Sequence, residues 1–85
     1  MENYRIEFKQ SVEKDLKRLP AKDRIRILRR IAPLKDNPRP EGCRKLSGQE
    51  RYRLRQGAYR ILYEIADRRL IVVVVKIGNR KDVYR

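Results

Sequence analysis

The feature that most constrains this fold is a run of three strand-like segments with almost no chain between them. They cover residues 50–56, 58–66 and 70–77, and turns are expected at residues 56–57 and 67–69. Parallel neighbours need crossover connections of about a dozen residues or more, so connections this short leave only antiparallel pairing. The second half of the chain is therefore predicted to be an antiparallel β-meander.

The first half of the chain carries the periods of one strand and two helices. Residues 3–8 alternate apolar with polar side chains, as a half-buried strand does. One helix is expected to begin with Ser11 as its N-cap and to end near Pro20, and a second to open at residues 21–23. The second helix is predicted to bury Ile25, Leu28, Ile31, Ala32 and Leu34 and to turn Lys22, Arg26, Arg29 and Arg30 mostly outward.

Two further features complete the predicted architecture. Pro33 is expected to kink the last turn of the second helix, and residues 36–42, which contain two prolines and a glycine, to form a connector. The stretch from Leu70 to Val75 is apolar on both faces, which is typical of a central strand covered on both sides. The predicted fold class is α+β: an N-terminal strand, a helical hairpin laid on one face, and an antiparallel sheet of three or four strands.

The charge of the chain points to an anionic partner. We expect the 85 residues to form one domain, residues 1–85, with a formal net charge of +13. Such an excess opposes folding by self-repulsion and exceeds what solubility requires, so a neutralising partner is the economical explanation. Nucleic acid is the leading class.

Several other classes of protein fit the composition poorly. The single cysteine, Cys43, permits no internal disulfide, and the first residues lack a signal-peptide pattern, so a cytoplasmic location is expected. The longest aliphatic run, Leu70 to Val75, is far shorter than the roughly 18 residues of a membrane span, so no membrane partner is expected. With no histidine and dispersed carboxylates, neither a metal nor another cofactor is predicted.

Alternating arginines give the strand-rich half its most specific signal. Arg53 and Arg55 project from the same face of their predicted strand, and a tight hairpin would bring Arg60 beside them. With only Glu50 and Glu64 nearby, converging guanidinium groups repel one another unless an anion binds. The arginines therefore predict a phosphate site, against the alternative of a solvated strand face with isolated ion pairs.

The C-terminal residues add two candidates. Arg80 follows a turn permitted by Gly78, and Tyr84 is penultimate, where it would either close the sheet, stack on a base or act as an acid or base. A free phenol, with a pKa of about 10, is a poor base at neutral pH, but neighbouring cations favour the phenolate. Because the chain has no histidine, the imidazole acid–base pair of many ribonucleases is excluded.

Four segments together give the chain a family resemblance. They are YRIEFKQSVEKDLKRLP near the start, RKLSG at 44–48, YRLRQGAYRILYEI in the middle, and VVKIGNRKDVYR at the end. The chain resembles RelE-type toxins of the RelE/ParE superfamily over nearly its whole length. That resemblance implies the same α+β fold, and it implies a ribosome-dependent endoribonuclease that enters the A site of the 30S subunit and cuts mRNA without a metal.

The resemblance also implies roles for individual residues. Arg53 and Arg55 would hold the scissile phosphate, Arg60 would stabilise the transition state, Arg80 would act on the leaving group, and Tyr84 would be the general base. For Arg80 we favour electrostatic stabilisation over proton donation, since a guanidinium holds its proton tightly. The basic residues expected to contact mRNA and ribosomal RNA are Arg51, Lys45, Arg26, Arg29 and Lys81.

The resemblance implies a second partner besides the ribosome. Toxins of this type are held inactive by an antitoxin, here expected to be an acidic, RelB-like chain that masks the basic surface. Two alternatives remain open: a ParE-like toxin that inhibits DNA gyrase, and a non-catalytic RNA-binding or ribosome-associated module. Many relatives have histidine where this chain has Asn79, so an imidazole at that position takes no part here.

Overall fold

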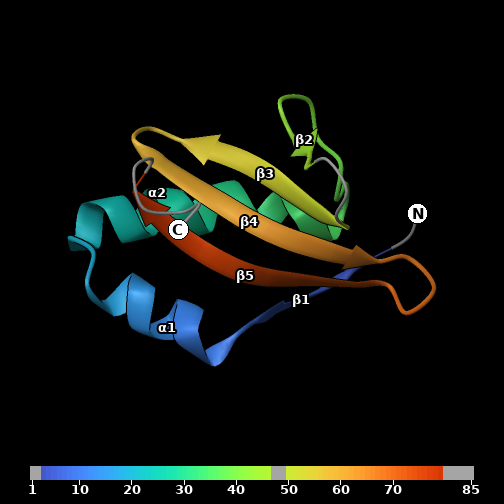
Figure 1. Cartoon of the computed structure of the whole chain (residues 1–85), viewed down its shortest axis with the longest axis horizontal. Coiled ribbons are helices and arrows are strands. Elements are labelled where there is room, and N and C mark those ends of the chain that lie inside the picture. Colours follow the sequence, from blue (N-terminus) through green and yellow to red (C-terminus); the bar gives the residue numbers. More distant parts are fainter. Residues whose placement is uncertain (1–2, 47–49, 80–85) are drawn as a thin grey trace.

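The computed structural model describes residues 3–46 and 50–79, and its centre is a β-meander. Its long strands are β3 (Arg51–Gln56), β4 (Tyr59–Ala66) and β5 (Ile71–Asn79), and each is antiparallel to the next in the chain. Figure 1 shows them side by side across the middle of the molecule. The predicted meander is confirmed, and β5 extends two residues beyond the predicted end at residue 77.

Two short strands complete the sheet in the order β1-β5-β4-β3-β2. The N-terminal strand β1 (Arg5–Phe8) runs parallel to β5, so the sheet is mixed where a purely antiparallel sheet was expected. Both helices lie between β1 and β5 in the chain, and that long connection is what permits parallel pairing. The other edge is β2 (Arg44–Lys45), which pairs with β3. It is too short for an alternation of polar and apolar residues to be recognised in the sequence.

The helical hairpin begins two residues earlier than predicted. Helix α1 (Gln10–Lys17) has Lys9 as its N-cap without a side-chain hydrogen bond, so Ser11 lies within the helix and the predicted cap is wrong. Helix α2 (Ala21–Ile31) follows Pro20 directly. Beyond it the chain continues as the 3₁₀ helix η1 (Ala32–Lys35), which contains Pro33. The α-helix therefore gives way to a 3₁₀ helix next to Pro33, where a kink was predicted. Proline has no backbone N–H, so it cannot donate the hydrogen bond that would continue the α-helix.

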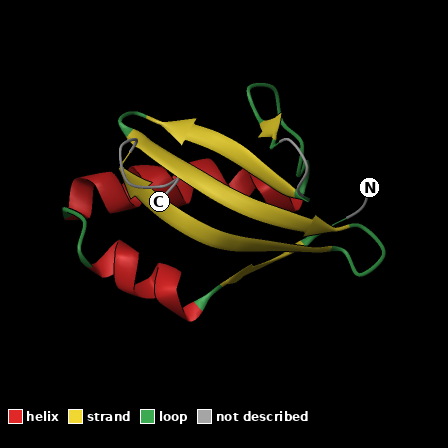
Figure 2. Ribbon diagram, viewed as in Figure 1, coloured by secondary structure: helices red, strands yellow, loops and turns green. Residues whose placement is uncertain are grey.

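Both helices pack on the same face of the sheet. Val12 of α1 and Ile27 and Ile31 of α2 are almost completely buried in one cluster with strand residues such as Leu54 and Tyr63. In Figure 2 α2 passes behind the strands and α1 lies beside β5. This cluster is the main core, and it confirms the predicted hairpin on one face.

The buried side of α2 differs from the prediction. Ile25, Leu28 and Ala32 are exposed, whereas Ile27, which was not assigned to the core, is fully buried. The sequence of α2 carries two apolar stripes, and periodicity alone does not say which one meets the sheet. The stripe that packs against the sheet is formed by Ile27, Ile31 and Leu34, and it continues from α2 into η1.

The opposite face of the sheet has a smaller apolar cluster. Leu62 and Val75 are buried there and pack with Leu46 and Val73. Val74 lies in the main core and Val75 on this face by ordinary alternation. A β-bulge at Leu62 and Tyr63 then adds one residue to β5, which returns Ile77 to the main core opposite Ile61. Among the described residues no helix is long and apolar enough to cross a bilayer.

Both turns of the meander lie slightly beyond their predicted positions. The β3–β4 loop is Gly57–Ala58, one residue later than expected, and Gly57 adopts a φ of +59°. A positive φ at the first loop residue suits a two-residue hairpin, and glycine adopts it without strain. The β4–β5 turn covers residues 67–70 and places Leu70 at a φ of +53°.

Candidate nucleic-acid interface

The three predicted strand arginines meet on one face of the β3–β4 hairpin. Arg55 lies directly opposite Arg60 in the strand register, and Arg53 is two residues from Arg55 on the same side. Tyr52 and Leu54, which alternate with them, point into the main core with the helices. The arginines therefore project from the face that carries no helix.

A fourth arginine on this face was missed by the sequence reasoning. Arg44 of β2 is directly opposite Arg53 and exposed. It was missed because a two-residue strand gives no alternation from which a face can be assigned. The four arginines thus come from three neighbouring strands.

The burial of these arginines is graded. Arg60 retains only 8% of its exposure, Arg53 is half-buried, and Arg55 is exposed. Arg55 and Arg60 also line a small hollow of about 40 Å³ beside the loop residues Gly57 and Ala58. Arg60 is held in place by its surroundings, whereas Arg55 can reach outward to a ligand.

The two nearby carboxylates pair with basic residues at the other end of the hairpin. Arg51 Nε donates to Glu64 Oε2 at 2.9 Å, and Lys45 Nζ lies 3.7 Å from Glu50 Oε1. Arg51 and Lys45 were predicted to contact RNA, and their charges are thus partly balanced within the chain. Exposed pairs of this kind are weak, so both side chains can exchange a carboxylate for a phosphate.

The remaining predicted site residues fall into two groups. Arg26 and Arg29 are exposed on α2, which packs on the other face of the sheet from Arg53, Arg55 and Arg60. Arg80, Lys81 and Tyr84 lie outside the described residues. Among those described, no three His, Cys, Asp or Glu side chains gather closely enough to hold a metal ion.

The last strand reaches the hairpin from the other side. Gly78 of β5 is opposite Arg60, and Asn79 is opposite Tyr59. The last two described residues of β5 therefore lie beside Tyr59 and Arg60, the most buried of the four arginines.

A tyrosine ties the hairpin end to α2. The Tyr59 hydroxyl donates to Asp23 Oδ2 at 2.8 Å, and this hydrogen bond is the main reason that the pKa of Tyr59 lies above its ordinary value of 10.0. The protonated phenol is thereby favoured, which makes Tyr59 a fixed donor rather than a base. Its role is to hold the hairpin against the helix.

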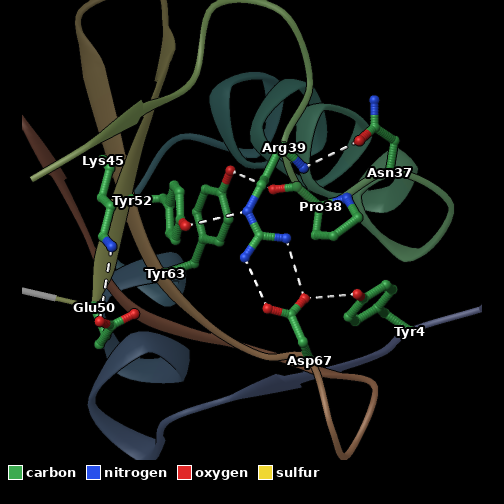
Figure 3. A network of polar contacts seen from close by, with 9 residues as sticks. All are labelled: Tyr4, Asn37, Pro38, Arg39, Lys45, Glu50, Tyr52, Tyr63 and Asp67. Carbon is green, nitrogen blue, oxygen red and sulfur yellow. Dashed lines mark hydrogen bonds and ion pairs between the residues drawn. The ribbon is translucent and has the colours of Figure 1, made fainter.

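A separate polar network lies beyond the far end of β4 (Figure 3). Asp67 accepts hydrogen bonds from Arg39 at 3.1 and 2.9 Å and from the Tyr4 hydroxyl at 2.8 Å. Arg39 Nε also donates to the Tyr52 hydroxyl at 3.1 Å, and its guanidinium lies 5.2 Å from the centre of that ring. The Tyr63 hydroxyl donates to Pro38 O at 2.8 Å, so the network fixes the connector that was read as irregular.

Comparison with known proteins decides the family. The model for the ParE toxin of type II toxin-antitoxin system, parDE, matches residues 6–84. The chain belongs to the RelE/ParE superfamily of toxins. The resemblance read from its motifs is therefore confirmed, and the protein is a toxin of a type II toxin-antitoxin system.

Individual relatives of the toxin carry RelE-type names. It is 30% identical over 86 residues to Toxin RelG of Mycobacterium tuberculosis, covering 96% of this chain and 97% of that protein. It is 27% identical over 86 residues to the mRNA interferase toxin RelE of Escherichia coli, covering 95% and 90%. The archaeal RelE–RelB complex from Pyrococcus horikoshii OT3 matches the toxin structure with a TM-score of 0.84 at 28% identity, covering 95% of this chain and 99% of that chain.

Proposed function

We propose that the toxin is a ribosome-dependent mRNA endoribonuclease that cuts messages in the A site. The observation that carries the proposal is the directly opposed pair Arg55 and Arg60, with Arg53 beside them on an open face of the sheet. A phosphodiester in the act of cleavage gathers negative charge on its non-bridging oxygens, and fixed guanidinium groups stabilise that charge. The name of the Escherichia coli relative, an mRNA interferase, supports the same reading.

The proposed reaction is an internal transfer at the scissile phosphate. The RNA 2′-oxygen forms a bond to phosphorus while the bond to the 5′-oxygen breaks, which leaves a 2′,3′-cyclic phosphate and a 5′-hydroxyl. Tyr84, as its phenolate, takes the proton of the 2′-hydroxyl, and the departing 5′-oxygen takes a proton from water while Arg80 stabilises its charge. Arg53 and Arg55 hold the phosphate, and Arg60 stabilises the transition state.

The rest of the basic surface would position the toxin on RNA. Arg51 and Lys81 would extend the phosphate-binding surface. Lys45, which is opposite Tyr52, and Arg26 and Arg29 of α2 would contact ribosomal RNA from the other face of the sheet. Arg44 joins the first group, because it lies across from Arg53. Each such phosphate contact releases counterions, so binding is expected to weaken steeply with salt.

The test is to map 5′ ends of messages in a translating extract with and without the toxin. New ends within codons are expected with wild type, and Tyr84→Phe and Arg60→Ala should remove most of them. If wild type produces no cuts, or if both variants cut as well as wild type, the enzymatic proposal fails.

A second candidate function is inhibition of DNA gyrase, which the match to the ParE family model favours. A supercoiling assay with purified gyrase separates the two functions. Inhibition of supercoiling together with intact messages would reverse our ranking, whereas cut messages and unaffected supercoiling would leave mRNA as the target.

A further inference from the structure

A hollow separates the tip of the β3–β4 hairpin from helix α2. The tip lies at the end of the sheet where α2 begins (Figure 1). The hollow has a volume of about 270 Å³, and it is lined by the two loop residues together with Asp23, Arg26, Gln56 and Tyr59. Both loop residues are exposed. Apolar packing therefore contributes little to the position of the loop, and polar contacts with the helix become important.

Two hydrogen bonds connect the hairpin to α2. In β4, the Tyr59 hydroxyl donates to Asp23 Oδ2 at 2.8 Å, and Tyr59 belongs to the last residue pair of the β3–β4 ladder. In β3, the backbone oxygen of Arg55 accepts a hydrogen bond from Arg30 Nε at 3.4 Å, which is long and therefore the weaker of the two. Each strand of the hairpin is thus attached to the same helix.

Each of these hydrogen bonds lies next to one of the two opposed arginines. Arg60 directly follows Tyr59, and neighbouring residues of a strand point to opposite faces of the sheet. A hydrogen bond that holds Tyr59 on the helix face therefore also holds the backbone from which Arg60 projects on the open face. The bond from Arg30 acts on the backbone of Arg55 itself. Because catalytic groups must be held to within about 0.5 Å, small shifts of this backbone should change the rate of the chemical step.

We propose that Tyr59 and Asp23 are positioning residues of the cleavage centre, whose hydrogen bond holds β4 so that Arg60 faces the scissile phosphate. The inference rests on the proposed function, mRNA cleavage, and adds two residues that touch neither the RNA nor the reacting atoms. Their bond is the stronger of the two connections because it is short and its acceptor is a carboxylate.

The test measures single-turnover cleavage of a message on programmed ribosomes over a range of toxin concentrations. Tyr59→Phe removes only the hydroxyl. We expect its maximal rate constant to fall about tenfold, while the toxin concentration for half-maximal rate stays within about twofold of wild type. Asp23→Ala should have the same effect, and the double variant should be no slower than either single variant because both break one bond. Asp23→Asn keeps a side-chain oxygen that can accept the hydrogen bond and should retain most of the wild-type rate.

Tyr4→Phe is the matched control. The Tyr4 hydroxyl also donates to an aspartate, Asp67, at 2.8 Å, but at the other end of β4. This variant should cut at close to the wild-type rate. Equal losses in Tyr59→Phe and Tyr4→Phe would reduce the effect to lost stability and overturn the proposal. It would also be overturned if Tyr59→Phe cut like wild type, or if only its half-maximal concentration changed.

A second measurement separates this proposal from the proposed function. Wild-type toxin that makes no cuts would contradict the function, and the position of Arg60 can then be followed by NMR through its Nε–H resonance in ¹⁵N-labelled toxin. This resonance is expected to shift in Tyr59→Phe and to stay in place in Tyr4→Phe. An Arg60 resonance that is the same in wild type and in both variants would overturn the positioning role, whether or not the toxin cuts RNA.

Discussion

The two ends of strand β4 use arginine in opposite ways. Beyond its C-terminal end, the Arg39 guanidinium donates hydrogen bonds to both carboxylate oxygens of Asp67 and to the Tyr52 hydroxyl (Figure 3). It also lies over the Tyr52 ring. At its N-terminal end, Arg60 is opposite another arginine, Arg55. At the first end the guanidinium joins separate parts of the fold, whereas at the second two arginines stand directly opposite each other on the face of the sheet that carries no helix.

The largest effect that this comparison predicts is on cleavage. Arg60→Ala should lower the rate of message cutting by about 10²–10³-fold, as removal of one transition-state donor does in other enzymes. The toxin should remain folded, which circular dichroism can verify. Arg68→Ala, which removes the same charge from the exposed β4–β5 turn, should cut at close to the wild-type rate. Equal losses in both variants would mean that only net charge matters.

The next effect is on stability, at the other end. Arg39→Ala removes the bidentate pair with Asp67, the hydrogen bond to Tyr52 and the contact with its ring. We expect the free energy of unfolding to fall by about 1 kcal/mol, a modest figure because the Arg39 side chain is 44% exposed and water screens the pair. Urea unfolding measures it. The matched control is Arg5→Ala, which breaks the more exposed pair with Glu7 and should leave the urea midpoint unchanged.

The same network should affect how the stability of the fold decreases at acid pH. The hydrogen bonds from Arg39, and then the one from Tyr4, lower the pKa of Asp67 from 3.8 to about 2. The folded state therefore takes up this proton less readily than the unfolded chain, so the contribution is complete above a pH of about 4 and is lost as the pH falls toward 2. The stability gap between wild type and Asp67→Asn should be constant near neutral pH and shrink below pH 4. If the difference in stability did not change with pH, the network would not stabilise the fold through the charge of Asp67.

The arrangements at the two ends of β4 were not equally predictable from the sequence. The arginine face follows from a period of two and from a short hairpin, both local features, so the meeting of Arg53, Arg55 and Arg60 was predictable. The Arg39–Asp67 pair joins residues 28 apart through an irregular connector, and no local pattern marks it. Arg39 and Asp67 were each unremarkable in the sequence until the fold brought them together.

Helix α2 shows the same limit in another form. Its two apolar stripes are both valid helical patterns, and the choice between them depends on the sheet that the helix meets. Ile27 was missed and Ile25 and Leu28 were wrongly placed in the core for this reason. The parallel pairing of β1 with β5 was likewise not predictable, because the sequence of a strand does not show which strand it pairs with or in which direction.

The smallest predicted effect tests the cost of the opposed arginines directly. Arg55→Gln keeps a long polar side chain and removes one of the two like charges that face each other across β3 and β4. Like charges directly opposite each other destabilise a sheet, so the variant should unfold at a slightly higher temperature than wild type in about 0.01 M salt. The gain should vanish in about 1 M salt, where charges are screened within roughly 3 Å. Arg39→Gln is the control and should change the unfolding temperature in the opposite direction at low salt, since it removes an attraction. If Arg55→Gln also destabilised the toxin at low salt, the fold itself would balance the charge of Arg55, and the contrast between the two ends of β4 would not hold.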